Sequence, residues 1–312
     1  MRVIVTGGAG FIGSNLVHAI IGENAVLVID DLSTGRPENI HPAAAMRTMD
    51  ILDGSLSTVF AEFAPEIVVH LAAQSSVSAS LVDPARDWAV NVEGTRAVSR
   101  AARESGVRLV LSASSAAVYG EPAELPLTES SPVHPANPYG ESKLAAEGAL
   151  AEELAGSPCD YASLRFANVY GPRQDATGEG GVVAAFCSAL AEGRAPVIHG
   201  DGGQTRDFIF VGDVVSALIA AIYCEVRLGD EAAPGGAAYN ISTGSEVSVH
   251  ALADSLRPVS EFLRPFEYTR ERPGDVRRSA LDASRAREAF GWHARVPLDT
   301  GLAATYRWFA SR

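Results

Sequence analysis

A glycine-rich turn between a strand and a helix constrains the fold of this chain more than any other stretch. Residues 2–7, "RVIVTG", predict a buried strand, and residues 11–21, "FIGSNLVHAII", predict a helix. Between them, Gly7, Gly10 and Gly13 follow a G-x-x-G-x-x-G spacing. Glycine lets the backbone approach a pyrophosphate, and a helix N-terminus favours an anion. The turn therefore predicts a dinucleotide site, and a tight turn without a ligand is the alternative.

Short apolar runs alternate with helical stretches along the first half of the chain. The strand "AVLVID" (25–30) follows the first helix. Further strands are predicted at residues 66–73, 107–114 and 161–171, and helices at 88–106 and 142–156. Apolar strands alternating with helices are typical of a parallel sheet that is covered on both faces. We therefore expect the α/β fold class, with a Rossmann doubly wound parallel sheet and a smaller C-terminal substrate-binding lobe.

The alternation loosens after Gly171. Residues 172–181 are polar and rich in glycine, 182–193 predict a helix, and 207–224 predict a strand followed by a helix. Residues 255–275 are rich in proline and arginine and are expected to be irregular. We expect a cofactor-binding domain that covers residues 1–165 plus about 205–235. We expect a substrate-binding domain that covers about 166–204 plus 236–312.

Composition excludes several classes of protein. The net charge of −13 speaks against nucleic-acid binding, because proteins that bind nucleic acids carry basic patches. The longest apolar stretch, residues 214–226, is too short to cross a bilayer, so no membrane association is expected. Three widely spaced cysteines, Cys159, Cys187 and Cys224, show neither a metal-ligand spacing nor a disulfide framework. We therefore expect no metal site and a reducing, cytoplasmic location.

An acidic residue at the end of the second strand bears on the choice of dinucleotide. At the position of Asp30, a carboxylate can accept hydrogen bonds from an adenosine ribose and would repel a 2′-phosphate. NAD is therefore expected rather than NADP. Asp50 and Ile51 follow another expected strand and are candidates to hold the adenine, although capping of a turn is an equal alternative for Asp50.

Lys143 is the only lysine among the 25 Lys and Arg residues, and it lies four residues after Tyr139. In a helix, side chains at this spacing share a face. A nearby cation favours the phenolate form of a tyrosine, so Tyr139 is expected to take a proton from a substrate hydroxyl. A compact ammonium suits this role better than a planar guanidinium. The alternative is a chance lysine on a solvated face.

Two serines follow the strand that should reach the cofactor. The stretch "SASSAAVYG" (112–120) places Ser115 where its hydroxyl would bond the reacting hydroxyl of a substrate and share its proton with Tyr139. Ser114 is the second choice for this role. Capping of the strand end is the alternative for either serine.

Together these motifs identify a family resemblance that covers nearly the whole chain. The sequence resembles the extended short-chain dehydrogenases/reductases and, within them, the nucleotide-sugar 4-epimerases of the UDP-glucose and UDP-glucuronate 4-epimerase type. The matching stretches are Gly7–Gly13, Asp30, "HLAAQ" (70–74), Asn91, "SSAAVYG" (114–120), "YGESK" (139–143), "LRFANVYGPRQ" (164–174), "DGGQTRDFIFVGDV" (201–214) and "RPGD" (272–275). The resemblance implies NAD as cofactor, a UDP-sugar as substrate and a homodimer that pairs through the helices 88–106 and 142–156.

The resemblance also assigns roles to individual residues. Those implied in catalysis are Ser115, Tyr139 and Lys143. Those implied in NAD binding are Gly7, Gly10, Phe11, Ile12, Gly13, Asp30, Asp31, Ser33, Thr34, Gly35, Asp50, Ile51, Leu71, Ala72, Ala73, Gln74, Asn91, Ser114, Tyr139, Lys143 and Phe166. Those implied in UDP-sugar binding are Ser75, Val77, Ser115, Ala116, Tyr139, Asn168, Gly181, Val182, Val183, Phe186, Val197, His199, Arg206, Arg272 and Asp275.

The resemblance further divides the UDP-sugar site into parts. Asn168 would hold the phosphates, and residues 181–186 with 197–199 would form the uridine pocket. Arg206 and Arg272 would clamp the diphosphate, since two guanidinium groups bind an anion well. Ordinary surface charge is the alternative for these arginines.

Two alanines narrow the expected reaction. Ala116 and Ala117 occupy the places where the related 4,6-dehydratases carry an Asp-Glu pair, and the related decarboxylases carry a Glu at the second place. Alanine neither donates nor abstracts a proton, so dehydration and decarboxylation are disfavoured. Many epimerases have a hydroxyl residue at position 117, and this chain departs from that pattern. The expected reaction is inversion at C4 through a transient 4-keto sugar, with NAD regenerated in each cycle.

The identity of the sugar is the least determined point. Ser279 stands where the family can carry a bulky aromatic residue, so an N-acetyl group or a C6 carboxylate would have room. The expected order is UDP-glucose/UDP-galactose, then UDP-glucuronate/UDP-galacturonate, then UDP-N-acetylhexosamine. A net NAD-dependent oxidoreductase and a non-catalytic NAD-binding sensor are the alternatives from other functional classes.

Overall fold

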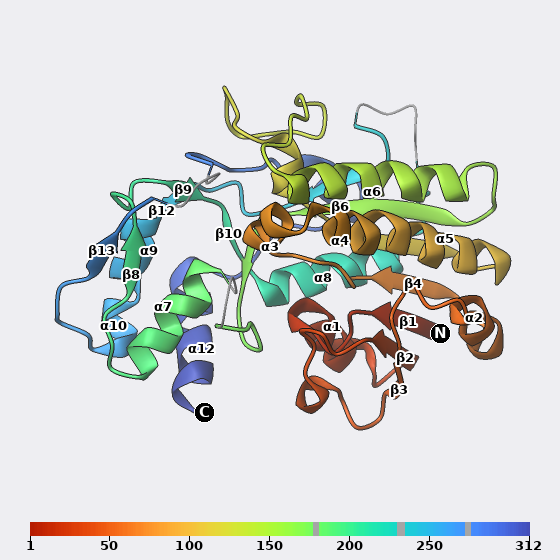
Figure 1. Cartoon of the computed structure of the whole chain (residues 1–312), viewed down its shortest axis with the longest axis horizontal. Coiled ribbons are helices and arrows are strands. Elements are labelled where there is room, and N and C mark those ends of the chain that lie inside the picture. The colour runs from red at the N-terminus through yellow and green to blue at the C-terminus, as the bar shows by residue number, and fades with distance from the viewer. Residues whose placement is uncertain (177–180, 230–234, 272–275) are drawn as a thin grey trace.

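A parallel sheet forms the centre of the computed structural model, which describes residues 1–176, 181–229, 235–271 and 276–312 (Figure 1). Within the described residues it has seven strands, each parallel to its neighbours. In spatial order they are β11 (Ala238–Ile241), β6 (Asp160–Phe166), β5 (Leu109–Ser115), β4 (Ile67–His70), β1 (Arg2–Thr6), β2 (Ala25–Asp30) and β3 (Ala45–Thr48). The order reverses between β1 and β4, where doubly wound sheets form a ligand crevice. The predicted fold class is confirmed.

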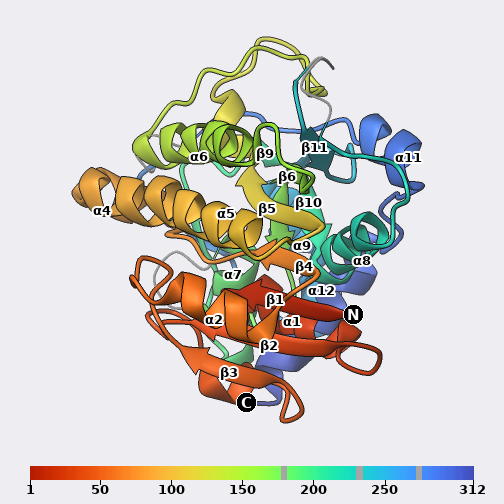
Figure 2. The same ribbon diagram turned by 90° about the vertical axis from the view of Figure 1, so that its right-hand side faces the viewer.

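Helices cover both faces of this sheet (Figure 2). Side chains alternate along a strand, so Val3 and Val5 of β1 pack on one face and Ile4 packs on the other. The Val3 face is covered by α1 (Phe11–Ile20), α8 (Val211–Ile222) and α11 (Ser284–Phe290). The Ile4 face is covered by α2 (Leu56–Phe63), α5 (Gly94–Glu104) and α6 (Pro138–Leu154). Strands buried on both faces explain the continuous apolar runs in the sequence.

Three short segments connect β4 to α5 at the carboxyl edge of the sheet. They are α3 (Val77–Val82), α4 (Pro84–Trp88) and the π-helical turn η2 (Ala89–Glu93). The predicted helix at 88–106 therefore begins with a π-helical turn rather than a regular one. Two single 3₁₀ turns, η1 (Pro37–Asn39) and η3 (Ala116–Tyr119), follow β2 and β5. These connections bring the carboxyl ends of β4 and β5 close to the start of α6 (Pro138–Leu154).

A second, smaller apolar cluster lies beside the sheet and includes buried Tyr170, Phe186, Leu252 and Leu302. Its helices are α7 (Val182–Ala191), α9 (Val249–Ser255), α10 (Arg257–Ser260) and α12 (Leu298–Ala310). Its strands pair two by two, as β7 (Asn168–Tyr170) with β10 (Phe208–Phe210), β8 (Val197–His199) with β13 (Glu267–Thr269), and β9 (Thr205–Arg206) with β12 (Val247–Ser248). Figure 1 shows most of these elements at the left of the molecule.

Two sequence expectations differ from the structure. The strand predicted at 161–171 is divided, because β6 ends at Phe166 and β7 leaves the central sheet to pair with β10. The central sheet also extends past residue 235, the limit expected for the cofactor domain, because β11 pairs with β6. The division into two domains otherwise stays a prediction. Among the described residues, no helix is long and apolar enough to cross a membrane.

Candidate functional site

The glycine turn lies at the reversal point of the sheet, where it leads from β1 into α1. Gly7 has φ +69°, and a Cβ there would lie 2.6 Å from Ala72 N, in the loop after β4. A Cβ on Gly13 would collide with Gly7 O and lie 2.8 Å from the Cα of Gly8. Gly10 is the N-cap of α1 and provides no side-chain cap, so the first N–H groups of the helix remain available to an anion. The turn fits a pyrophosphate.

Asp30 joins the glycine turn to the loop after β2. Its carboxylate is buried, and it accepts hydrogen bonds from Ala9 N (2.9 Å) and Leu32 N (2.9 Å). Burial raises the pKa of Asp30, and the two backbone N–H groups oppose this shift. A Cβ on Gly35 would lie 2.5 Å from Asp30 Oδ1, so only a glycine lets the loop lie this close. Each carboxylate oxygen retains a lone pair for a ribose hydroxyl.

Other predicted cofactor residues make local contacts. Asp31 accepts hydrogen bonds from Ser33 N (2.9 Å) and Ser33 Oγ (2.6 Å), and it is exposed. Asp50 is exposed and accepts a hydrogen bond from Leu52 N (2.9 Å). This contact fits the alternative that Asp50 caps a turn. Ile51 is buried in the apolar cluster under α2 and α5. The roles of these residues toward a cofactor stay predictions, as do those of Phe11, Ile12, Thr34, Leu71, Ala73 and Phe166.

Tyr139 and Lys143 lie in the first turns of α6. Lys143 Nζ is 6.0 Å from the centre of the Tyr139 ring and donates a hydrogen bond to Ala113 O (3.1 Å). Burial raises the pKa of Tyr139, and the nearby hydroxyl of Ser115 opposes this rise. Burial lowers the pKa of Lys143 to about 8. The structure thus brings together the three residues predicted to be catalytic.

The start of α6 is positioned by polar contacts from neighbouring segments. Asn137 is the N-cap, and its Oδ1 accepts from Gly140 N (2.9 Å). A Cβ on Gly140 would lie 2.6 Å from Ala117 O, so α6 packs directly on η3. Tyr139 N donates to Ser80 Oγ of α3 (3.1 Å). These contacts bring α6 against the end of β5, where Ser115 lies.

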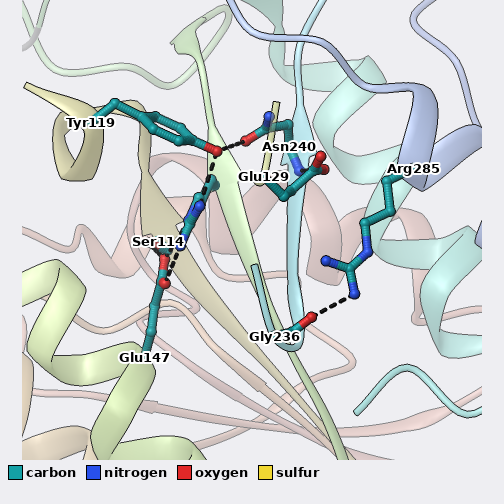
Figure 3. Close-up of polar contacts among 8 residues, drawn as sticks. Ser114, Tyr119, Glu129, Glu147, Gly236, Asn240 and Arg285 are labelled. Atoms are coloured by element: carbon teal, nitrogen blue, oxygen red, sulfur yellow. Dashed lines mark hydrogen bonds and ion pairs between the residues drawn. The ribbon is translucent and has the colours of Figure 1, made fainter. Parts of the chain in front are cut away.

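Ser114 is directed away from Tyr139. Its hydroxyl donates to Glu147 Oε1 (2.5 Å), and Glu147 accepts two further hydrogen bonds from Arg165, at 2.9 Å from Nε and 2.7 Å from Nη2 (Figure 3). Arg165 Nη1 donates to Tyr119 OH (2.9 Å), and Tyr119 OH donates to Asn240 Oδ1 (2.8 Å). This network joins α6 to β5, β6 and β11, and a role of Ser114 toward the cofactor stays a prediction.

Sequence reasoning missed Glu147 and Arg165. Arg165 is a charged residue within the apolar strand β6, and its side chain is only 4% exposed. Glu147 lies one helical turn after Lys143, and its side chain is 13% exposed. A lone arginine in an apolar strand indicates a buried partner of opposite charge. The sequence therefore indicated that Arg165 has a buried partner, but it did not identify Glu147 as that partner.

Asn91 holds the loop that follows β4. Its Oδ1 accepts from Gln74 N (2.9 Å), and its Nδ2 donates to Gln74 O (3.0 Å) and Ser142 Oγ (2.9 Å). The Asn91 amide therefore pairs with the backbone of Gln74 and links it to α6. Gln74 was predicted to contact NAD, and its own side-chain Nε2 donates to Ser76 O (2.8 Å) and Asp87 Oδ1 (2.6 Å).

His70 lies buried at the end of β4, and sequence reasoning also missed it. Thr95 Oγ1 donates to Asn91 O (2.6 Å), so it accepts from His70 Nε2 (3.1 Å). His70 Nδ1 then accepts from Thr6 Oγ1 (2.7 Å). Burial, together with the charge of Lys143, lowers the pKa of His70 to about 3. The ring is therefore neutral and joins β1, β4 and α5 through hydrogen bonds.

The predicted UDP-sugar residues lie in several parts of the fold. Val183 and Phe186 are each 2% exposed and pack in the core of the smaller cluster, whereas Asn168 is exposed at the start of β7. Gly181 is the N-cap of α7 with φ +84°. Three other predicted members belong to the first half of the chain: Ser75 lies in the loop after β4, Val77 in α3 and Ala116 in η3.

Strand β8 carries two further predicted residues. Val197 is 41% exposed, and His199 Nδ1 forms a hydrogen bond with Arg270 O (3.2 Å). Arg206 lies in β9, and its Nη1 donates to Thr205 O (2.7 Å). The second half of the predicted diphosphate clamp, Arg272, lies outside the described residues, as does Asp275. Their roles, and that of Val182, stay predictions. In the described ranges, no group of three or more His, Cys, Asp or Glu is arranged to hold a metal ion.

Comparisons with known proteins agree with this geometry. Residues 3–241 match the family described as the NAD dependent epimerase/dehydratase family. A UDP-glucose 4-epimerase from Mycolicibacterium smegmatis is 44% identical over 319 residues, which cover 100% of this chain and 99% of the relative. The crystal structure of a UDP-glucose 4-epimerase with UDP-glucose from Thermotoga maritima has a TM-score of 0.94 and 37% identity, and the match covers 100% and 99% of the two chains. A UDP-glucose 4-epimerase from Thermus thermophilus in complex with NAD has a TM-score of 0.90 and 35% identity, with 99% of each chain covered.

Proposed function

Because the chain belongs to the NAD dependent epimerase/dehydratase family, we propose that it is an NAD-dependent UDP-sugar 4-epimerase that interconverts UDP-glucose and UDP-galactose. The observation that carries this proposal is the cluster of Ser115, Tyr139 and Lys143, which lies at the same carboxyl edge of the parallel sheet as the glycine turn. The choice of sugar is supported by the 44% identity to a UDP-glucose 4-epimerase over the whole chain.

The residues around the glycine turn fit NAD. Gly7, Gly10 and Gly13, with the uncapped start of α1, would hold the pyrophosphate, and Asp30 would accept from the adenosine ribose. A buried carboxylate at Asp30 disfavours the additional phosphate of NADP. When bound, NAD would supply reversible acceptance of a hydride from C4 of the sugar, with no net oxidation.

Tyr139 is the proposed general base and acid. It removes the proton of the sugar 4-hydroxyl and returns it after the 4-keto sugar has turned over. The Ser115 hydroxyl is close enough to the Tyr139 phenol to oppose the rise of its pKa, so it is placed to bond the same sugar oxygen. The Lys143 ammonium stabilises the phenolate by its charge. The smaller lobe would hold the UDP while the sugar turns, and Asn168 and Arg206 are the described residues proposed for its phosphates.

Epimerisation is favoured over dehydration by the residues after Ser115. Ala116 and Ala117 form the start of η3, and neither carries a group that transfers a proton. Elimination of water from a sugar requires an acid and a base at the departing hydroxyl and the adjacent carbon. The described side chains at this position therefore suit reversible oxidation at C4 alone.

A homodimer and a cytoplasmic location are also part of the proposal. Helices α5 and α6 lie side by side (Figures 1 and 2) and are joined by Arg96–Glu152 (2.8 Å) and Arg100–Glu153 (3.0 Å). The paired helices would meet those of a second copy as a four-helix interface. The three cysteines are free thiols, which supports a reducing compartment. A monomeric mass by light scattering would contradict the dimer.

The test is incubation of the purified protein with UDP-glucose, UDP-glucuronate and UDP-N-acetylglucosamine in separate samples. Proton NMR of the anomeric region reports formation of a 4-epimer in each sample. We expect UDP-galactose from UDP-glucose, without accumulation of NADH absorbance. If only UDP-glucuronate or only UDP-N-acetylglucosamine were epimerised, the assigned sugar would change. Net formation of NADH would indicate an oxidoreductase.

A further inference from the structure

Asp87 is a buried carboxylate beside the catalytic pair that has no role in the mechanism above. It lies in α4 and is 1% exposed. Its Oδ1 accepts from Gln74 Nε2 (2.6 Å) and from Asn91 Nδ2 (3.3 Å). Its Oδ2 is buried without a hydrogen-bond partner. A buried carboxylate oxygen without a donor is costly unless a nearby cation compensates its charge.

The elements that pack against α4 offer one such cation. These elements are α3, η2 and α6. Helix α3 carries no charged residue. The titratable groups on η2 and α6 are Glu93, Tyr139, Glu141, Lys143, Glu147, Glu152 and Glu153. Lys143 is thus the only cation on these elements, whereas Arg86, on α4 itself, is exposed to solvent.

The other buried carboxylate near Lys143 already has its own partner. Glu147 is matched by the guanidinium of Arg165 through two hydrogen bonds and also accepts from Ser114. Asp87 makes no ion pair within 4.0 Å in the part of the chain that the structure describes. The charge of Asp87, unlike that of Glu147, therefore has no cationic partner at ion-pair distance. It acts on the Lys143 ammonium from farther away.

We propose that Asp87 is a positioning residue for the catalytic pair, and that its carboxylate supplies the buried negative charge that keeps the Lys143 ammonium protonated. This role rests on the proposed function, in which Lys143 must remain charged. Burial alone favours loss of the lysine proton, and Asp87 is the leading influence that raises the pKa of Lys143 against it. The same charge raises the pKa of Tyr139. Asp87 therefore shifts both groups of the pair in the same direction.

Hydrogen bonds fix the carboxylate in this position. Gln74 and Asn91 donate to the same oxygen, and Asn91 also donates to Ser142 on α6. Ser142 precedes Lys143 in the chain, so one amide links the carboxylate to the helix that carries the lysine. The substitution Asp87→Asn keeps an oxygen for Gln74 and Asn91 and places an amide where the structure has an unpartnered oxygen. It removes the charge with little change in shape.

Because Lys143 is the only lysine in the chain, its titration can be measured directly. Protein with its bound cofactor, labelled with ¹³Cε-lysine and carrying no lysine in any tag, gives one lysine resonance. We expect Asp87→Asn to lower its titration midpoint by about one pH unit, since a unit charge at this range shifts a buried group by that order. The matched control is Asp83→Asn, which removes a charge from the exposed N-cap of α4 and should leave the midpoint unchanged.

An unchanged midpoint in Asp87→Asn overturns the proposal. If this variant does not fold, Asp87→Ser, which is also neutral, must show the lower midpoint. The resonance requires no substrate, so the result stands even if no sugar is epimerised. With an active enzyme, both limbs of the pH profile of kcat/KM should move to lower pH in Asp87→Asn, because Tyr139 and Lys143 both lose protons more readily. A purely structural role would lower the rate without moving either limb.

Discussion

Lys143 Nζ lies 6.0 Å from the centre of the Tyr139 ring, and its hydrogen bond goes to Ala113 O of β5. The end of the strand therefore fixes the ammonium near the phenol ring. Tyr139 in turn lies near Ser115, at the end of the same strand. The end of this one strand thus lies close to all three residues that are predicted to be catalytic.

Replacement of Tyr139 by phenylalanine removes the proposed base. We expect kcat to fall by about 10²–10⁴-fold, the usual contribution of a positioned acid or base. Binding of UDP-glucose and of NAD should persist, because the ring itself remains. The control is Tyr223→Phe, at an exposed tyrosine. Unchanged turnover in Tyr139→Phe would revive the non-catalytic NAD-binding alternative.

Lys143→Met should remove a pH-dependent contribution to native stability. Burial lowers the pKa of Lys143 to about 8 from 10.5, so between these values the unfolded chain binds a proton that the native state does not. Native stability therefore rises with pH across this window. Below about pH 8, the full free-energy cost of burying the charged lysine is present. On going from pH 10.5 down to pH 7, the wild type should lose up to about 3 kcal/mol of stability that the variant does not lose. Urea unfolding of both proteins at pH 7 and pH 10 checks this, and the same pH dependence in both would contradict it.

His70 should make the protein sensitive to acid. Its pKa falls from 6.5 to about 3 on folding, so the unfolded chain binds an extra proton between these values. Stability is lost as pH falls through this window, by about 1.4 kcal/mol per pH unit. Thermal unfolding between pH 7 and pH 4 should show a weaker pH dependence in His70→Asn than in the wild type. His293→Asn, at an exposed histidine, should behave like the wild type.

Gly13→Ala should distort the dinucleotide turn. The new Cβ would collide with Gly7 O, so α1 must move from the sheet. We expect a loss of about 1–3 kcal/mol in unfolding free energy, as for other overpacked sites, together with weaker NAD binding in calorimetry. Gly22→Ala, where a Cβ would meet no atom within 4 Å, is the control. Equal NAD affinity in the two variants would argue against the proposed role of the turn.

The ion pair of Glu147 and Arg165 should show strong coupling. Arg165→Met leaves a buried carboxylate without its cation, and we expect a loss of about 3–5 kcal/mol. The double variant Glu147→Met/Arg165→Met should be more stable than Arg165→Met, because no unpaired charge remains. Denaturant unfolding of the single and double variants measures this coupling, and additive losses would refute it.

The local sequence determined the elements that carry the chemistry. The glycine spacing between a strand and a helix predicts the dinucleotide turn, and the spacing of Tyr139 and Lys143 predicts that they share a helix face. The apolar strands predict a parallel sheet covered by helices. In each case the reason is physical: the steric freedom of glycine, the period of a helix and the burial of a strand depend on neighbours in the chain.

Tertiary structure alone decided which distant groups meet around α6. Arg165 of β6 reaches Glu147 of α6, Ser114 turns to that carboxylate, and Asp87 of α4 lies buried beside Lys143 with one oxygen unpartnered. None of these relations follows from a sequence spacing, because each depends on how α4, α6 and the sheet pack together. Burial of charge depends on three-dimensional packing, so the electrostatic surroundings of Lys143 are determined only when the chain is folded.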